Sequence, residues 1–170
     1  MDDVYLGNPL LKKANVAQEF TQEQILEFMA CKQDPVYFAK RHVKIVSLDE
    51  GLVPFEPYDF QERLINNFHE NRFNICKMPR QTGKSTTSVS YLLHYAVFND
   101  NVNIGILANK AATARDLLGR LQTAYENLPK WMQQGIISWN KGSLELENGS
   151  KILAASTSAS AVRGMSFNIL

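Results

Sequence analysis

The chain has 170 residues, of which 45% are hydrophobic and 21% are charged. These values are typical of a soluble globular protein with one main domain and room for a small helical addition. Lysine and arginine number 18 and aspartate and glutamate 17, so the net charge gives no support for nucleic-acid binding.

The sequence shows no sign of secretion or membrane insertion. Asp2 and Asp3 stand where a secretory signal would be basic, and no apolar run approaches the ~20 residues of a membrane span. The two cysteines are isolated, and Cys76 lies in an apolar stretch where we expect a buried, reduced thiol. We therefore expect a protein of a reducing compartment that is neither secreted nor transmembrane.

Two short helices are predicted near the N-terminus. Residues 1 to about 20 show weak patterning and are interpreted as an arm or a loosely docked lead-in. A Thr-x-x-Gln capping box at Thr21 starts the first helix, and Asp34, followed by proline, starts a second that ends near His42. We assign residues 1–55 to this arm and helical subdomain.

The segment 45–50 ends in Asp49 and Glu50, which imitates the paired carboxylates that follow a buried strand in many ATPases. Lys44 and Ser47 interrupt its apolar run, and a glycine follows directly. We therefore interpret the segment as an exposed turn.

Gln61 begins a helix whose apolar face consists of Phe60, Leu64, Ile65 and Phe68. A glutamine amide both donates and accepts hydrogen bonds, which suits the edge of adenine, and a nearby aromatic ring can stack on the face of the base. The alternative is a solvated glutamine at a helix start, which the residues alone favour.

The segment from Met78 to Ser85 reads Met-Pro-Arg-Gln-Thr-Gly-Lys-Ser and ends as a phosphate-binding P-loop does. Residues 73–77 alternate apolar and polar side chains and predict a short strand before it, and apolar residues at helical spacing predict a helix from Ser85 to Phe98. The free N–H groups and positive dipole of that helix would face a polyphosphate. The alternative is an ordinary glycine-containing turn before a helix.

Each residue of the loop has a physical role in this interpretation. Gly83 has no Cβ where the backbone approaches the phosphates, Lys84 can reach the β and γ phosphates, and the Ser85 hydroxyl can complete a Mg²⁺ shell. Met78 replaces the usual first glycine, and Pro79 presets the turn. The expected nucleotide-binding residues are Gln61, Arg80, Gln81, Thr82, Gly83, Lys84 and Ser85.

Beyond the loop helix, residues 102–108 predict a buried strand and 114–128 a long helix. The alternation of strands and helices predicts an α/β fold of the P-loop NTPase (RecA/helicase-like) type, with a mostly parallel sheet. Short strands follow at 136–139, 144–147 and 150–154, joined by hairpin turns, as an antiparallel addition.

A strand begins at residues 167–170, and no aspartate or glutamate follows Glu147. A P-loop ATPase needs a carboxylate for Mg²⁺ at a second strand end and a glutamate to activate water. We therefore expect residues 56–170 to be an ATPase domain truncated before the end of this Walker B strand.

Four local signatures resemble the large terminase subunit of tailed bacteriophages, specifically the packaging ATPase of the T4-like phages. They are residues 78–85, 105–110, 139–150 and 161–167. The resemblance runs from about residue 5 to residue 170. It implies an ATP-driven motor of the host cytoplasm that docks on the portal protein of an empty prohead and pumps in double-stranded DNA. Its implied cofactors are ATP and Mg²⁺, and its implied partners include the small terminase subunit and other large subunits in a ring, with no membrane.

The resemblance also implies roles for single residues. Lys84 and Ser85 bind the triphosphate and Mg²⁺, and Arg80 corresponds to an arginine finger supplied in cis, which makes Arg80 and Lys84 the expected catalytic residues. The alternative for Arg80 is pairing with a surface carboxylate. Gln61 matches the family's adenine-recognising glutamine. Arg163 is either an ordinary loop arginine or a contact to DNA or a neighbouring subunit, and both interpretations stay open.

The resemblance also implies that the C-terminal nuclease of full-length relatives, which cuts concatemeric DNA, is not to be expected within these 170 residues. Because the expected carboxylates are also missing, we expect this part of the protein to hold ATP and to hydrolyse it poorly or not at all. The alternatives are a helicase-like DNA-dependent translocase and a non-catalytic nucleotide-binding module.

Overall fold

A computed structural model describes residues 3–47, 49–158 and 164–170. The helices are α1 (Gln22–Gln33), α2 (Pro35–His42), α3 (Asp59–Glu70), α4 (Lys84–Phe98) and α5 (Ala111–Glu126). The strands are β1 (Val4–Tyr5), β2 (Asn8–Lys12), β3 (Lys44–Ser47), β4 (Gly51–Pro54), β5 (Asn103–Ala108), β6 (Ile136–Trp139), β7 (Ser143–Leu146) and β8 (Lys151–Ser156). All of the predicted helices are present. Arg163 lies outside the described residues.

The main sheet is mixed and has the strand order β5-β8-β7-β6. Strands β5 and β8 are parallel, whereas β8, β7 and β6 are joined by antiparallel pairing. The predicted α/β class and the antiparallel addition are confirmed, but the described sheet is not mostly parallel. On the free side of β5, Ile169 forms a single parallel bridge with Ile104, so the predicted C-terminal strand is present only as this bridge.

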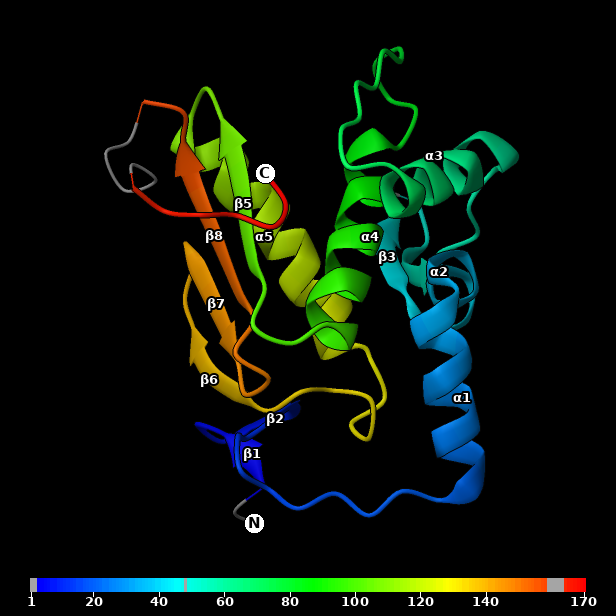
Figure 1. Ribbon diagram of the computed structural model, residues 1–170, viewed down its shortest axis with the longest axis vertical. Coiled ribbons are helices and arrows are strands. Elements are labelled where there is room, and N and C mark those ends of the chain that lie inside the picture. The colour runs from blue at the N-terminus through cyan, green and yellow to red at the C-terminus, as the bar shows by residue number, and fades with distance from the viewer. Residues whose placement is uncertain (1–2, 48, 159–163) are drawn as a thin grey trace.

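Helix α4 lies between the sheet with its covering helix α5 and the helices α2 and α3 (Figure 1). Its side chains are buried on most sides, and Leu93, Ala96 and Val97 belong to the same core cluster as Phe38 of α2 and Ile104 of β5. One hydrophobic core therefore joins the N-terminal helices to the sheet. In the part of the chain that the structure describes, none of the helices is long and apolar enough to cross a membrane.

The predicted strand at residues 73–77 is wrong. Residues 71–83 form a loop that extends from the end of the molecule at which α4 begins (Figure 1). Phe73 is 84% exposed and Ile75 is fully exposed, and Cys76 is exposed instead of buried. Alternating side chains form a stable strand only where a neighbour accepts the backbone hydrogen bonds, and none of the described strands pairs with this segment.

Two further segments are more ordered than predicted. In the segment where an exposed turn was expected, residues 45–47 belong to β3, which pairs with β4 from Lys44 with Pro54 to Ser47 with Gly51. The predicted N-terminal arm contains a second hairpin, β1–β2, which docks on the body through the buried side chain of Leu11. Both hairpins are too short and too exposed to give a clear alternating pattern.

Gln133 holds the N-terminal hairpin in place. Its Oε1 accepts a hydrogen bond from the backbone N–H of Lys12 at 3.0 Å, and its Nε2 donates to the backbone oxygen of Leu10 at 3.0 Å and that of Leu128 at 3.1 Å. The side chain is buried, so these groups have no access to water as a substitute.

We expect Gln133→Leu to lower the free energy of unfolding by about 2 kcal/mol, because it leaves several buried backbone groups without a partner. Urea unfolding of the purified chain measures this loss. Gln122→Leu is the matched control, because within the described residues Gln122 bonds only the Asn140 oxygen, at an exposed position, and its loss should change stability little. Equal losses for the two variants would contradict the role given to Gln133.

His94 lies in an aromatic cluster at the centre of the molecule, with ring centroids 5.5 Å from Phe38 and 4.9 Å from Phe98. Its Nε2 is 2.9 Å from the backbone oxygen of Cys31, and its buried Nδ1 has no partner among the described residues. Burial lowers the pKa of His94 from 6.5 to about 4. The folded protein therefore keeps this ring neutral where an unfolded chain would bind a proton.

The free energy of unfolding should consequently fall as the pH drops from about 7 to about 4, by up to about 3 kcal/mol, and the contribution of His94 should level off below that. The sign follows because the unfolded state binds the proton first. Urea unfolding at several pH values tests this. His94→Gln should flatten the slope in this window. An unchanged slope in His94→Gln would refute the assignment.

Candidate functional site

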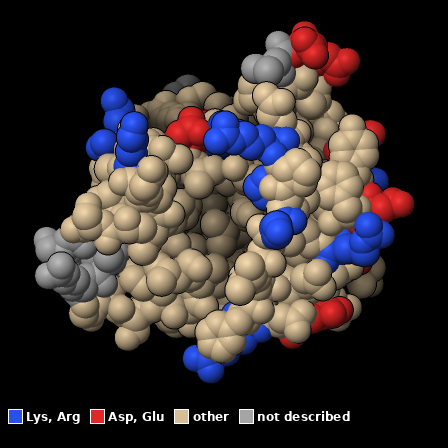
Figure 2. Space-filling view, turned by 90° about the horizontal axis from the view of Figure 1, so that it is seen from above, with Lys and Arg blue, Asp and Glu red and all other residues tan. Residues whose placement is uncertain are grey.

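The loop before α4 contains most of the predicted site residues. Gly83 is the N-cap of α4 and has a left-handed backbone with φ of 74°, and Gln81 also has a positive φ of 62°. No side chain caps this helix. The N–H groups of the first turn therefore face outward with no intrahelical acceptor, as an anion-binding helix end requires. Seen from above, this end of the molecule is hollowed, and lysine and arginine side chains lie around the hollow (Figure 2).

Lys84 folds back under its own loop. Its Nζ donates to the backbone oxygen of Met78 at 3.0 Å and to that of Pro79. The Thr82 hydroxyl donates to the same Pro79 oxygen at 3.0 Å. The loop thus closes around the lysine ammonium. A bound phosphate would compete with the Met78 and Pro79 carbonyl oxygens for this ammonium.

Gln61 contacts this loop from α3. Its Oε1 accepts from the backbone N–H of Tyr58 at 2.9 Å, and its Nε2 donates to the backbone oxygen of Thr82 at 3.2 Å. The residue is only 5% exposed. The structure therefore brings Gln61 together with the loop residues predicted to bind nucleotide, although the two segments are separated by about 20 residues in the sequence.

Two aromatic side chains lie beside Gln61 at the start of α3. The rings of Tyr58 and Phe60 are stacked with centroids 5.7 Å apart, and Tyr58 is largely exposed. An exposed ring beside a glutamine amide is able to stack on a flat base. The sequence indicated that an aromatic residue would serve here without identifying which one.

The remaining predicted residues lie at the surface. Arg80, Gln81 and Ser85 are exposed. Among the described residues, no carboxylate lies within ion-pair distance of Arg80, so the pairing considered as its alternative role is not formed there. The guanidinium and the Ser85 hydroxyl are therefore accessible at the same end of the molecule as the loop.

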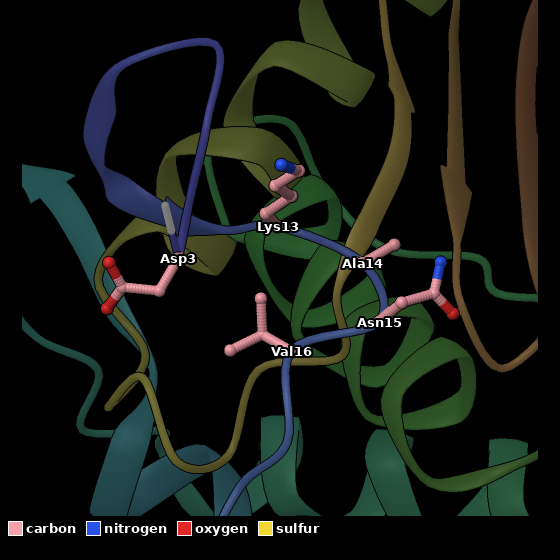
Figure 3. Close-up of a pocket in the computed structure, with 5 residues that line it drawn as sticks. All are labelled: Asp3, Lys13, Ala14, Asn15 and Val16. Carbon is pink, nitrogen blue, oxygen red and sulfur yellow. The ribbon is translucent and has the colours of Figure 1, made fainter. Parts of the chain in front are cut away.

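Two other places were candidates by their chemistry. A recess of about 580 Å³ lies under the N-terminal hairpin and is lined by Asp3, Lys13, Ala14, Asn15 and Val16, whose two charged groups point apart (Figure 3). It lies at the opposite end of the molecule from the loop (Figure 1) and contains none of the predicted site residues.

The second place is a cluster of Glu27, Cys31 and His42, whose possible ligand atoms lie within 4.8 Å of one another. Glu27 is already engaged by the Tyr37 hydroxyl at 3.0 Å, by His42 Nε2 at 2.7 Å and by the Arg41 guanidinium at 3.6 Å. Burial raises the pKa of the Cys31 thiol to about 12, so the thiolate that a metal would bind is disfavoured. The cluster therefore links α1 to α2 through the hydrogen bonds and ion pairs of Glu27.

Comparison with solved structures finds the same fold in the large terminase of bacteriophage HK97, with a TM-score of 0.64 and 19% sequence identity. The match covers 80% of this chain and 29% of that chain, so this chain spans less than a third of the length of the HK97 protein. At this identity the likeness shows the fold alone.

Comparison with protein families gives a match over more than half of this chain. The family described as "Terminase large subunit, T4likevirus-type, N-terminal" matches residues 75–170. This range covers more than half of the 170 residues and includes the loop, α4, α5 and the main sheet. The chain therefore belongs to the terminase large subunit family of the T4-like type.

Proposed function

We propose that this chain binds ATP with Mg²⁺ at the loop of residues 78–85 and forms the ATP-binding part of a motor that moves viral DNA into proheads. The observation that carries the proposal is the start of α4 at Lys84, directly after a left-handed Gly83, in a chain of the terminase family. The uncapped first turn, the lysine in the loop and the accessible serine are the donor set that a triphosphate and its metal require.

The residues divide between binding and catalysis. Lys84 and the backbone N–H groups from Gly83 to Ser85 hold the phosphates, and the Ser85 hydroxyl is a ligand for Mg²⁺. Bound Mg²⁺ neutralises charge on the phosphate oxygens. Arg80 is free to stabilise charge on the transferred phosphoryl group, because it has no ion-pair partner among the described residues.

The wider role follows from family membership. We propose double-stranded DNA, the portal protein, the small terminase subunit and further large subunits as partners, and the host cytoplasm as the place of action. We also propose that residues 56–170 correspond to a RecA-like ATPase domain and residues 1–55 to its N-terminal subdomain. The HK97 chain is more than three times longer than the region matched, so these assignments concern the whole protein.

Hydrolysis requires groups that the printed sequence lacks. Residues 148–170 contain no aspartate or glutamate, so the segment that bridges β5 through Ile169 offers no carboxylate for Mg²⁺ or for the attacking water. The chain should therefore bind ATP without efficient turnover.

Lys84→Ala tests the binding site directly. We expect at least tenfold weaker ATP binding, because the variant loses charge-assisted hydrogen bonds to the phosphates. Isothermal titration calorimetry with MgATP measures the change. Lys141→Ala, at an exposed position in the turn between β6 and β7, is the control and should bind as the wild type does. Equal affinity of Lys84→Ala and wild type would refute the site.

A second test concerns turnover. Phosphate release from the wild-type chain should stay at the background that the Lys84→Ala variant gives, because the carboxylates for hydrolysis are missing. Sustained release that Lys84→Ala abolishes would show that other groups in this chain complete the catalytic site.

A further inference from the structure

We infer that Gln61 is a positioning residue that anchors one half of the phosphate-binding loop, and that this anchor sets the affinity for the triphosphate whatever base it carries. The inference rests on the proposed function and deepens it. It differs from the adenine-recognising role implied by the family resemblance, because it concerns the phosphates.

The Gln61 amide is bonded to the protein backbone at both its oxygen and its nitrogen. Its oxygen accepts from Tyr58 and its nitrogen donates to the Thr82 oxygen, so one acceptor site and one donor are committed to the protein backbone. At 5% exposure the side chain leaves little of the amide free for a base edge. In this arrangement Gln61 joins the first turn of α3 to the loop.

The loop backbone approaches the Gln61 side chain closely at Gly83. A Cβ on Gly83 would lie 2.4 Å from Gln61 Nε2, so the loop backbone packs directly against the amide. Gly83 also has a φ of 74°, which a residue with a side chain rarely adopts. The conformation of the last loop residue and the position of Gln61 therefore depend on each other.

Different side chains hold the two halves of the loop. Gln61 fixes Thr82 and Gly83, whereas Met78 and Pro79 are held by the lysine ammonium. A triphosphate draws Lys84 away from the first half, which is then held through the Thr82 hydroxyl, and Thr82 itself is anchored by Gln61. That anchor keeps the first N–H groups of α4 aligned before the triphosphate binds. Binding therefore does not have to order them at a cost in entropy.

Gln61→Met tests the anchor, because methionine has a similar length and no amide. We expect about fivefold weaker binding of inorganic tripolyphosphate, MgATP and MgGTP alike, which is the effect of losing one buried hydrogen bond. Isothermal titration calorimetry with the full chain measures all three. Loss of affinity for ATP alone, with tripolyphosphate unchanged, would overturn the inference and favour base recognition.

The matched control is Gln24→Met. Gln24 occupies the same position in the capping box of α1, where its Oε1 accepts from the backbone N–H of Thr21 at 3.1 Å, but it does not touch the loop. This variant should lose less thermal stability than Gln61→Met, because its hydrogen bond is exposed, and it should bind all three ligands normally. Equal loss of affinity in both variants would overturn the inference, because general loosening of a helix start would then explain the effect.

A measurement without ligand separates this inference from the proposed function. Backbone ¹⁵N relaxation should show lower order parameters for Thr82 and Gly83 in Gln61→Met than in wild type or Gln24→Met. Unchanged order parameters would overturn the anchor even if nucleotide binds. A wild-type chain that binds none of the three ligands would refute the proposed function, and the relaxation data would then decide the anchor by themselves.

Discussion

The burial of α4 is the constraint on which the other features of this structure depend. The helix packs against α5, α2 and α3, and buried side chains such as Tyr91 and Leu93 lie on opposite faces of it. A helix enclosed in this way cannot shift without opening the core. Its first turn, which carries Lys84, is therefore fixed in position by packing far from the loop itself.

The opposite end of α4 is fixed as well. The Asn148 side-chain amide donates to the backbone oxygens of Ala96 at 2.9 Å and Asn99 at 3.0 Å, and the Ser150 hydroxyl donates to the Asn99 oxygen at 2.8 Å. These bonds satisfy carbonyl groups at the end of the helix and join it to the hairpin turn of the sheet. The helix thus connects the sheet rigidly to the loop of residues 78–85.

The sequence predicted those parts of the fold that local chemistry decides. The capping box at Thr21, the N-cap at Asp34 and the hairpin turn at Asn148 and Gly149 each act within a few residues, and each is formed as expected. The strand at residues 73–77 was predicted wrongly because a strand also needs a neighbour, which no local pattern reveals. The contacts by which Gln133 docks the N-terminal hairpin were not predicted for the same reason, since Gln133 is more than 100 residues away from it.

The sequence indicated which residues make up the candidate site, but it did not indicate which of them contact one another. The Gly-Lys-Ser motif and the helix after it identify the loop residues from spacing alone. The hydrogen bond from Gln61 to Thr82, and the return of the Lys84 ammonium to Met78, depend on how α3 and the loop pack in three dimensions. Such contacts have no periodicity that a sequence would show.

The solvated segment at residues 73–77 also has a practical consequence for handling the protein. It presents Phe73 and Ile75 to water, and none of the described strands pairs with its backbone N–H and C=O groups. Stretches of this kind act as templates on which other molecules add strands edge to edge. Concentrated solutions of the isolated chain should therefore aggregate, and a solubility tag or dilute working conditions would keep it monodisperse.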